Sequence, residues 1–319
     1  MKTLVLAGKD LEKILTMELA IPAVEKAFAA HGRGEAVMPP KLYLPMEKYA
    51  GDFRAMPSLL GDAAGVKWVN MHPENPKRFN LPAVMGVYIL SDPETAFPLA
   101  VMDGTRLTSF RTGAAAAVAS KYLAVKTPAT VGFIGCGVQA RKLLAAHRAL
   151  YSGFRAVMAD VSAEAAEKFA KEAGGFAASV DQAGSCDIIC TSTPSRAPVL
   201  HRSYVGISTH INAMGADAPG KQELDTALLK KSRVVVDEWG QASHAGEINV
   251  AVEKAGYARK DIAGQLGEIL AGGKPGRTGA ADITIFDSTG LAIQDVSVAR
   301  LIYDKAVKLQ KGQVLQLHG

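Results

Sequence analysis

The chain has 319 residues, 48% hydrophobic and 21% charged, and this ordinary globular composition excludes a disordered or low-complexity protein. The formal net charge is +5, but lysines and arginines are interspersed with acidic residues, so no basic surface for nucleic acid is expected. The longest apolar runs, such as Leu81–Leu90, are shorter than the ~20 residues of a membrane span, and we expect a cytoplasmic protein without a membrane or nucleic-acid partner.

The first third of the chain is expected to form an α+β domain. Asp10 and Thr16 are residue types that cap helices, and a helix-like pattern of apolar residues follows them. After Gly34 the sequence changes to short runs of β-forming residues separated by Pro, Gly, Asn and Asp, which is typical of strands joined by hairpins. These runs are 41–44, 52–57, 66–71, 83–90 and 99–102.

Beyond Thr108 the pattern alternates predicted strands with predicted helices. Strands are predicted at 130–134, 156–159, 187–191, 210–213, 234–237 and 283–286. Strands that alternate with helices predict βαβ crossovers and a parallel sheet, so the fold class is α/β. A last helix after Gly290 is expected to return to the first domain.

The strongest local motif is an apolar strand, residues 130–134, that continues into Gly135-x-Gly137-x-x-Ala140 and a helix. Gly135 permits a tight turn, and Gly137 lets the backbone approach a pyrophosphate. Val138 and Gln139 begin the helix, whose free N–H groups attract phosphate. The motif predicts a Rossmann dinucleotide site, and the alternative is a glycine turn in an unrelated α/β fold.

Asp160 ends the next predicted strand and is the expected partner of the adenosine ribose. An acidic side chain there accepts both ribose hydroxyls and repels a 2′-phosphate. The predicted cofactor is therefore NAD, in preference to NADP.

Three later segments, 191–195, 212–221 and 286–290, lie at the predicted carboxyl ends of strands, where open α/β sheets bind ligands. Their small side chains and hydroxyls suit a nucleotide, although small polar residues also occupy such loops for structural reasons alone. The candidate cofactor contacts in them are Thr191, Thr193, Met214, Gly215, Ser288 and Thr289.

Asp217 differs from its neighbours because it is a carboxylate between turns rich in Gly and Pro. A carboxylate near the reacting end of the cofactor can exchange protons with a substrate nitrogen or with water. The alternative is a structural Asp that caps a helix predicted over residues 223–230.

Four cations stand out in and just after the first domain, namely Lys41, Arg54, Lys67 and Arg111. Each could be a solvated surface residue, since Lys and Arg are mostly exposed. Several cations on one sheet could instead hold a carboxylate, which Arg binds through two parallel hydrogen bonds. No metal is expected, because the histidines and the three cysteines lack ligand spacing.

Motifs spread over nearly the whole chain occur in the order seen in one protein family. They include Met38-Pro-Pro-Lys41, Arg54-Ala-Met-Pro57, Gly65-Val-Lys-Trp-Val-Asn70, Arg111-Thr-Gly113, Gly132-Phe-Ile-Gly-Cys-Gly137, Gly215-Ala-Asp-Ala-Pro-Gly-Lys221, Gly246-Glu-Ile-Asn249 and Phe286-Asp-Ser-Thr-Gly290. The chain therefore resembles the ornithine cyclodeaminase and mu-crystallin family. This similarity is more specific than the glycine motif alone.

The resemblance implies a Rossmann NAD-binding domain over residues 113–292. It also implies an α+β substrate-binding and dimerisation domain, formed by residues 1–112 and 293–319, that pairs two subunits into a homodimer. The apolar residues Val84, Val87 and Ile89 are then candidates for burial, either in the core or in the interface.

The resemblance also assigns roles to the cations and to Asp217. It makes Lys41, Arg54 and Lys67 substrate-site residues, Arg111 and Thr112 contacts to the cofactor phosphate, and Asp217 the acid/base. Lys41 and Asp217 are the candidates to relay protons. Which of them acts as the base depends on burial and mutual charge and stays open.

Within the family the chain resembles the archaeal alanine dehydrogenases. In ornithine cyclodeaminases a glutamate typically occupies the place of Arg54 and receives the distal amino group of the substrate, so the opposite charge here favours a small amino acid and its 2-oxo acid. The expected function is reversible, NAD-dependent oxidative deamination of L-alanine to pyruvate and ammonia. The alternatives are an ornithine cyclodeaminase, a related imine reductase, or a non-catalytic nucleotide-binding protein like mu-crystallin.

Overall fold

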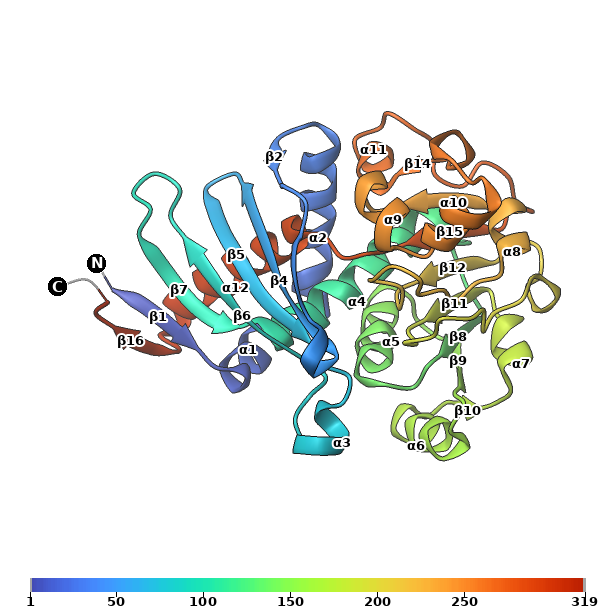
Figure 1. The fold of residues 1–319 in the computed structure, drawn as a ribbon, viewed down its shortest axis with the longest axis horizontal. Coiled ribbons are helices and arrows are strands. Elements are labelled where there is room, and N and C mark those ends of the chain that lie inside the picture. Colours follow the sequence, from blue (N-terminus) through green and yellow to red (C-terminus); the bar gives the residue numbers. More distant parts are fainter. Residues whose placement is uncertain (1, 318–319) are drawn as a thin grey trace. The chain divides into compact units, whose positions relative to one another are not determined.

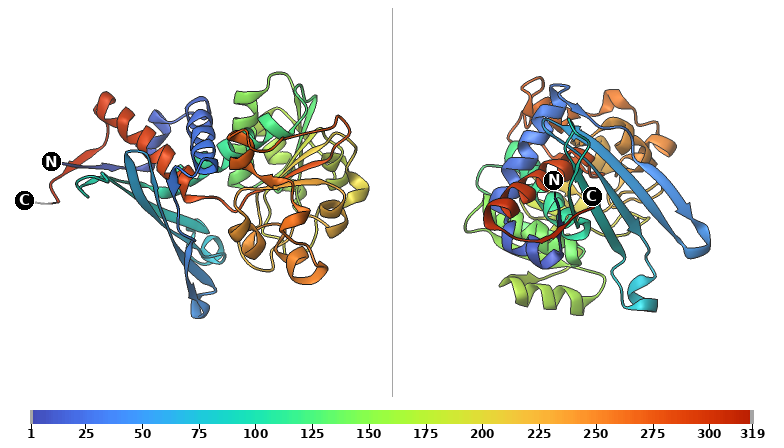
Figure 2. Two further views of the ribbon diagram at one scale, coloured as in Figure 1. Left: turned by 90° about the horizontal axis from the view of Figure 1, so that it is seen from above. Right: turned by 90° about the vertical axis from the view of Figure 1, so that its left-hand side faces the viewer.

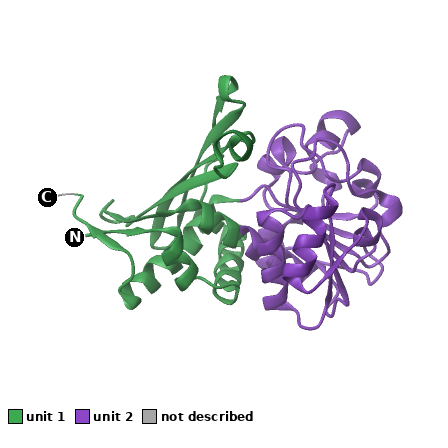
Figure 3. Ribbon diagram, turned by 90° about the horizontal axis from the view of Figure 1, so that it is seen from below, with its two compact units in different colours: residues 1–111, 291–319 green, residues 112–290 purple. Residues whose placement is uncertain are grey.

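The computed structural model describes residues 2–317, and the chain divides into two compact units (Figure 3). Unit 1 comprises residues 1–111 and 291–319, and unit 2 comprises residues 112–290. The domain limits expected from the sequence differ from these by one residue at the first boundary, 112 against 111, and by two at the second, 293 against 291. Among the described residues, no helix combines the length and apolar character needed to cross a bilayer.

Unit 1 is built on one mixed sheet of eight strands (Figure 1). The strands are β1 (Thr3–Leu6), β2 (Ala36–Val37), β3 (Leu42–Met46), β4 (Gly51–Leu60), β5 (Ala63–Met71), β6 (Val84–Ser91), β7 (Pro98–Asp103) and β16 (Gln313–Leu315). Their order is β16-β1-β7-β6-β5-β4-β2, and β3 also pairs with β4. From β3 to β7 each strand pairs antiparallel with the next, as the hairpin pattern predicts, whereas β1 lies parallel to β7.

The helices that begin in unit 1 are α1 (Gly8–Ile14), α2 (Met17–Gly32), α3 (Asn75–Phe79), α4 (Gly104–Leu123) and α12 (Ala292–Leu309), with the short 3₁₀ helix η1 (Glu47–Tyr49). Helix α12 packs against β4, β5 and β6, and α2 packs against α12 (Figure 2). Thr16 is the N-cap of α2, but the expectation that Asp10 is an N-cap is wrong. Ala7 is the N-cap of α1, and the Asp10 carboxylate accepts the Ala7 N–H at 3.1 Å from inside the first turn.

The side of the sheet that α12 covers carries both apolar and charged residues. Met56 and Val69 form an apolar cluster with Ala292 of α12. Arg54 and Lys67 lie two residues from them on β4 and β5 and therefore share this side of the sheet. They are only 7% and 1% exposed, a burial that Arg and Lys rarely reach without partners.

The opposite side of the sheet exposes large apolar side chains. Trp68, Val87 and Ile89 are 41%, 45% and 39% exposed. Val84 begins the same strand as Val87 but packs against the apolar cluster on the covered side. Of the three β6 residues expected to be buried, only Val84 belongs to the core of the chain.

Unit 2 contains eight strands, all parallel. They are β8 (Thr130–Ile134), β9 (Arg155–Ala159), β10 (Phe176–Ala177), β11 (Ile188–Thr191), β12 (His210–Ala213), β13 (Arg233–Val236), β14 (Gly264–Gln265) and β15 (Thr284–Asp287). The order is β10-β9-β8-β11-β12-β15-β13-β14. This doubly wound sheet is a Rossmann-like fold, and it confirms the predicted α/β class.

Helices cover both faces of the parallel sheet (Figure 1). They are α5 (Val138–Leu150), α6 (Ala163–Ala173), α7 (Val180–Gly184), α8 (Thr226–Lys230), α9 (Trp239–Ala245), α10 (Asn249–Ala255) and α11 (Leu266–Leu270), with the 3₁₀ helices η2 (Arg202–Tyr204) and η3 (Arg259–Asp261). Val131 and Phe133 of β8 join the core formed with α5 and α6, whereas Ile134 joins the core formed with α7 to α10. Burial on both faces explains why these strands are continuously apolar.

Candidate active site

Two loops meet near the middle of the unit 2 sheet, after β8 and after β11. The chain leaves β8 towards β9 on one side and later forms β11 on the other, and such a switch point is the ligand crevice of an open α/β sheet. Gly135 follows β8 with φ +92°, and a Cβ there would lie 2.8 Å from the Ser192 carbonyl oxygen. Glycine is therefore required by the backbone conformation and by the packing of the two loops.

The start of α5 has the features of a phosphate site. Gly137 is its N-cap and makes no side-chain capping hydrogen bond, and a Cβ on Gly137 would meet no atom within 4 Å. The N–H groups of Val138 and Gln139 follow, at the positive end of the helix dipole. The side-chain oxygen Oε1 of Gln139 is buried without a hydrogen-bond partner in residues 2–317. These features fit the pyrophosphate of a dinucleotide.

Asp160 connects the glycine loop to the end of β9. Its Oδ2 accepts the Cys136 N–H at 2.7 Å, and its Oδ1 accepts the Ser162 N–H at 2.9 Å. A carboxylate has about four acceptor positions, so two remain for ribose hydroxyls. Asp160 thus shapes the loop as well as being the predicted ribose partner.

Glu223 is a buried carboxylate that sequence reasoning placed at the start of a helix, whereas α8 begins only after it. It accepts the Thr191 hydroxyl at 2.7 Å, the Thr193 N–H and hydroxyl at 2.6 and 2.8 Å, and the Gly215 N–H at 2.8 Å. Burial raises the pKa of Glu223. The Thr191 hydroxyl helps to hold the loops after β11 and β12 together, and its expected contact with the cofactor remains a prediction.

Three more buried carboxylates continue from Glu223 as a chain, and each of them accepts a hydrogen bond from a backbone N–H. Glu247 accepts the Glu223 N–H at 2.9 Å, and Asp287 accepts the Glu247 N–H at 2.9 Å. Asp237 accepts the Thr289 N–H at 2.6 Å. Burial and the neighbouring Asp237 raise the pKa of Asp287 to about 8, and burial raises that of Glu247. The sequence signal for this chain of carboxylates was weak, because its members come from four separate segments.

The remaining candidate cofactor contacts are largely covered by protein. Ser288 and Thr289 are buried, and the Thr289 hydroxyl is within hydrogen-bond distance of Asp237. Met214 packs against the core formed with α5, and Thr112 is a buried residue of α4. Cofactor contacts from these residues remain predictions.

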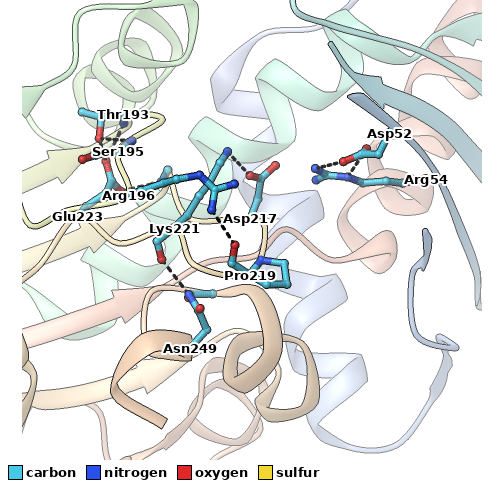
Figure 4. Close-up of polar contacts among 12 residues, drawn as sticks. Asp52, Arg54, Thr193, Ser195, Arg196, Asp217, Pro219, Lys221, Glu223 and Asn249 are labelled. Atoms are coloured by element: carbon cyan, nitrogen blue, oxygen red, sulfur yellow. Dashed lines mark hydrogen bonds and ion pairs between the residues drawn. The ribbon is translucent and has the colours of Figure 1, made fainter. Parts of the chain in front are cut away.

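Asp217 lies in the loop after β12 and is paired with a lysine (Figure 4). The Lys221 Nζ lies 2.6 Å from Asp217 Oδ1. Asn249 fixes this loop, since its amide donates to the Lys221 carbonyl at 2.8 Å and its Oδ1 accepts the Gly220 N–H at 2.9 Å. Asp217 is not a helix cap, because Asp225 caps α8 instead.

In unit 1, Lys67 of β5 is buried against Asp295 of α12. The lysine Nζ lies 2.8 Å from both carboxylate oxygens. Burial, together with the positive charges of Arg111 and Lys41, lowers the pKa of Lys67 to about 7 against the opposing effect of Asp295. Lys41, just before β3, therefore lies within electrostatic range of Lys67. The sequence prediction missed Asp295, which is 228 residues away along the chain.

Arg111 belongs to the same buried cluster. Its Nε donates to Asp295 Oδ1 at 3.1 Å, and one terminal nitrogen donates to the Gln294 side-chain oxygen at 3.0 Å. One polar atom of unit 1, Gln294 Nε2, is buried without a hydrogen-bond partner in the described part of the chain. Orphaned groups of this kind are rare in native interiors, so the atom is available to a bound molecule.

Arg54 forms a fork-shaped ion pair with Asp52 on the same strand (Figure 4). Its Nε and one terminal nitrogen lie 2.8 and 3.0 Å from the two Asp52 oxygens. The guanidinium carbon lies 5.3 Å from the centre of the Tyr43 ring. The Asp52 carboxylate therefore offsets the positive charge of Arg54 from which a small amino-acid substrate was expected.

Within residues 2–317, no three His, Cys, Asp or Glu side chains are arranged to hold a metal ion. Cys136, Cys186 and Cys190 are free thiols. Burial raises their pKa to about 11, 11 and 12, so they are neutral near pH 7.

Comparison with known proteins gives full-length similarities. The family model "Ornithine cyclodeaminase/mu-crystallin family" matches residues 1–310. An alanine dehydrogenase of Archaeoglobus fulgidus is 50% identical over 99% of both chains. A solved archaeal alanine dehydrogenase dimer with bound NAD is 49% identical, with a TM-score of 0.96 and full coverage of both chains. The Thermococcus litoralis Δ1-pyrroline-2-carboxylate reductase, solved with NADH and L-proline, is 37% identical, with a TM-score of 0.93 over 98% of this chain and 99% of that one.

Proposed function

The chain belongs to the ornithine cyclodeaminase/mu-crystallin family, and from that premise we propose that it is an NAD-dependent alanine dehydrogenase. The reaction converts L-alanine, NAD⁺ and water to pyruvate, ammonium, NADH and a proton, and it is reversible. The single observation that carries the proposal is the 50% identity to an alanine dehydrogenase over 99% of both chains. The buried cations of unit 1 and the dinucleotide features of unit 2 agree with it.

NAD supplies the hydride acceptor for this chemistry when it is bound. The turn from Gly135 to Gly137 and the first N–H groups of α5 would hold its pyrophosphate, and Asp160 its adenosine ribose. The Asp160 charge opposes a 2′-phosphate, so calorimetry should show tighter binding of NAD than of NADP. Equal or tighter binding of NADP would remove this assignment of Asp160.

The substrate carboxylate is assigned to the buried cations of unit 1. Lys67 and Arg111 share the single carboxylate of Asp295, and Lys41 lies within electrostatic range of Lys67. Two cationic groups around one carboxylate, in surroundings of low dielectric, favour a further anion. Arg111 was expected at a cofactor phosphate, but its place beside Lys67 supports a contact to the substrate instead.

Proton transfer is assigned to Lys67 as well as to Asp217 and Lys41. A group whose pKa lies near the working pH can both give and take a proton, and the pKa of Lys67 is lowered to about 7. During deamination the amine must lose a proton and the imine must be hydrated, so at least two transfers are required. The Asp217 carboxylate, placed by Lys221 and by the loop that Asn249 holds, is the proposed second group.

The pair formed by Arg54 and Asp52 supports a small, uncharged substrate side chain. An ornithine ammonium would need a counter-charge, but the charge of the Asp52 carboxylate is already balanced by Arg54. The ammonium would have to compete with the Arg54 guanidinium for that carboxylate. The preference against ornithine therefore rests on the paired state of Asp52 and not on simple repulsion by Arg54.

The exposed side of the unit 1 sheet is the proposed contact of a homodimer. It holds a groove of about 700 Å³ whose lining includes Phe53, Trp68, Met85 and Val87. Exposed apolar patches of this kind mark interaction sites on soluble proteins, and the archaeal relative above was solved as a dimer. The proposed location is the cytoplasm, where free thiols such as Cys190 persist.

A second candidate function is reduction of a cyclic imine. It is favoured by the 37% identity to the pyrroline-carboxylate reductase, which was solved with NADH and L-proline. Carboxylate binding and proton delivery by Lys67 would serve that reaction equally well, because both reactions pass through an imine beside a carboxylate.

The deciding experiment mixes the purified protein with NAD and, in separate reactions, L-alanine, L-proline and L-ornithine. NADH absorbance and the products are followed together. Alanine should give NADH, pyruvate and ammonium in equal amounts. Proline as the preferred substrate would establish the imine reductase, whereas proline formed from ornithine without accumulation of NADH would establish a cyclodeaminase.

A further inference from the structure

Asp52 and Arg54 occupy the covered side of β4 as next-but-one neighbours, which places both side chains on one face. Their side chains are 22% and 8% exposed, so the pair is shielded from solvent and stronger than a surface ion pair. Tyr43, directly opposite Arg54 on β3, places its ring beside the guanidinium. Arg54 is therefore held in one orientation by an anion and an aromatic ring.

The Asp52 carboxylate occupies the hydrogen-bonding fork that would recognise a carboxylate on a substrate side chain. Arg binds carboxylates best through two parallel N–H donors, and Arg54 gives its Nε and one terminal nitrogen to Asp52. Asp52 thus stands in for a second substrate carboxylate. It also cancels the positive charge that would attract one.

The register of β4 and β5 places Arg54 close to the proposed carboxylate site. Val69 lies opposite Arg54, and Lys67 is two residues from Val69 on the same face. Such diagonal neighbours have Cβ atoms roughly 7–8 Å apart. The two carboxyl carbons of a four-carbon amino diacid are separated by three bonds of about 1.5 Å each, so long Lys and Arg side chains can reach one carboxylate each.

We propose that Asp52 is a specificity-determining residue, which restricts the substrate to monocarboxylic amino acids by occupying Arg54. The inference rests on the proposed function, because it takes Lys67 and Arg111 as the site of the carboxylate that alanine and aspartate have in common. Removal of the Asp52 charge frees the two Arg54 donors that bind it and makes the site more positive by one unit charge. The site then accepts the second carboxylate of L-aspartate.

The test compares the wild-type protein with Asp52→Asn and Asp52→Ser, in kcat/KM for L-aspartate and for L-alanine. Aspartate, NAD⁺ and water would give oxaloacetate, ammonium, NADH and a proton, the same balance as for alanine. The aspartate-to-alanine ratio should rise roughly 10- to 100-fold, the range for one or two hydrogen bonds to a charged group. The double variant Asp52→Asn/Arg54→Met should not show this rise in the aspartate-to-alanine ratio.

Asp62→Asn is the matched control, because Asp62 is an exposed aspartate of unit 1 that also pairs with an arginine, Arg300. Its aspartate-to-alanine ratio should equal that of the wild type. Thermal unfolding of each variant separates loss of folding from loss of specificity. If both Asp52 variants fold but the ratio stays unchanged, or if the double variant keeps the gain, the inference is wrong.

A binding measurement keeps the inference separate from the proposed reaction. Succinate and propionate are aspartate and alanine without their amino groups, and their affinity for the protein loaded with NADH can be measured by calorimetry. Asp52→Asn should raise the succinate-to-propionate affinity ratio even if alanine is not the substrate. An unchanged ratio in a folded variant contradicts the role of Asp52, whereas absence of alanine turnover in the wild type contradicts only the proposed function.

Discussion

At the scale of single residues, the unusual feature of unit 1 is a lysine that is almost fully buried and yet paired. Removing a lysine from water disfavours its charged form, and Asp295 opposes that effect by accepting two hydrogen bonds. The nearby cations Arg111 and Lys41 lower the pKa again. The result is a lysine that changes charge near pH 7 instead of near 10.

This balance predicts a pH dependence that Lys67→Arg should abolish. If Lys67⁺ donates a proton when pyruvate is aminated, that rate falls as pH rises through about 7, the lowered pKa of Lys67. In the oxidative direction the neutral lysine accepts the proton, so that rate rises over the same range. Arg stays protonated, so the variant should show neither the fall nor the rise in rate near pH 7. Its kcat should be lower by roughly 10²- to 10⁴-fold. Steady-state profiles in both directions check this, with the exposed Lys77→Arg as control.

Asp217 allows a second test of the proton path. Asp217→Ala should lower kcat by roughly 10²-fold or more while NAD affinity stays near its original value, because only a positioned acid/base is lost. Lys221→Met should give a smaller loss in kcat, since the carboxylate remains but its partner at 2.6 Å is gone. An Asp217→Ala protein with full activity would show that the proposed mechanism is wrong.

At the scale of the elements, Glu223 joins the ends of two strands. Four donors, from the last residue of β11 and from the loops after β11 and β12, converge on its carboxylate. Glu223→Ala leaves them without an acceptor and should lower the free energy of unfolding by at least about 1–3 kcal/mol. It should also weaken NAD binding, since the loops lose their position. Urea titrations and calorimetry measure both effects, and Thr191→Val, which removes one donor, should cost less.

The carboxylate chain predicts that stability depends on pH with a defined sign. The folded-state pKa of Asp287 is about 8 against an ordinary value of 3.8, so the folded protein keeps a proton that the unfolded chain releases between those values. This contribution to stability is complete below about pH 4 and is lost as pH rises towards about 8. Urea unfolding at several pH values should therefore show a flatter profile for Asp287→Asn than for the wild type. Parallel profiles would contradict the assignment.

The same elements show what the sequence could predict. Strands 130–134 and 210–213 were predicted with the bounds that the structure gives, because buried parallel strands form continuous apolar runs between clear turns. The two-residue edge strands β10 and β14 were missed, since two residues carry no periodic pattern. Asp295 was missed because an acidic residue in an amphipathic helix normally faces solvent. The available signal for a buried ion pair was Lys67, a charged residue at a strand position that the alternation of side chains places on the covered face.

At the scale of the whole molecule, the two sides of the unit 1 sheet have different tasks. The side covered by α12 holds the paired cations, and the other side exposes Trp68, Val87 and Ile89. Alternation along β6 separates Val84 from Val87 and Ile89 but does not tell which face the chain itself covers, so the sequence alone left all three as candidates for burial. The exposed face follows only from the position of α12, which comes from the far end of the chain.

Substitution on that exposed face tests the proposed dimer without disturbing the core. Val87 and Ile89 are already 45% and 39% exposed, so Val87→Lys/Ile89→Lys should leave the chain folded. The added charges would be buried in a dimer interface, where unpaired charge is costly, so light scattering at micromolar concentration should show a monomer. Val161→Lys, at a fully exposed valine of unit 2, should remain dimeric. A monomeric wild-type protein, or a double variant that stays dimeric, would place the subunit contact elsewhere or remove it.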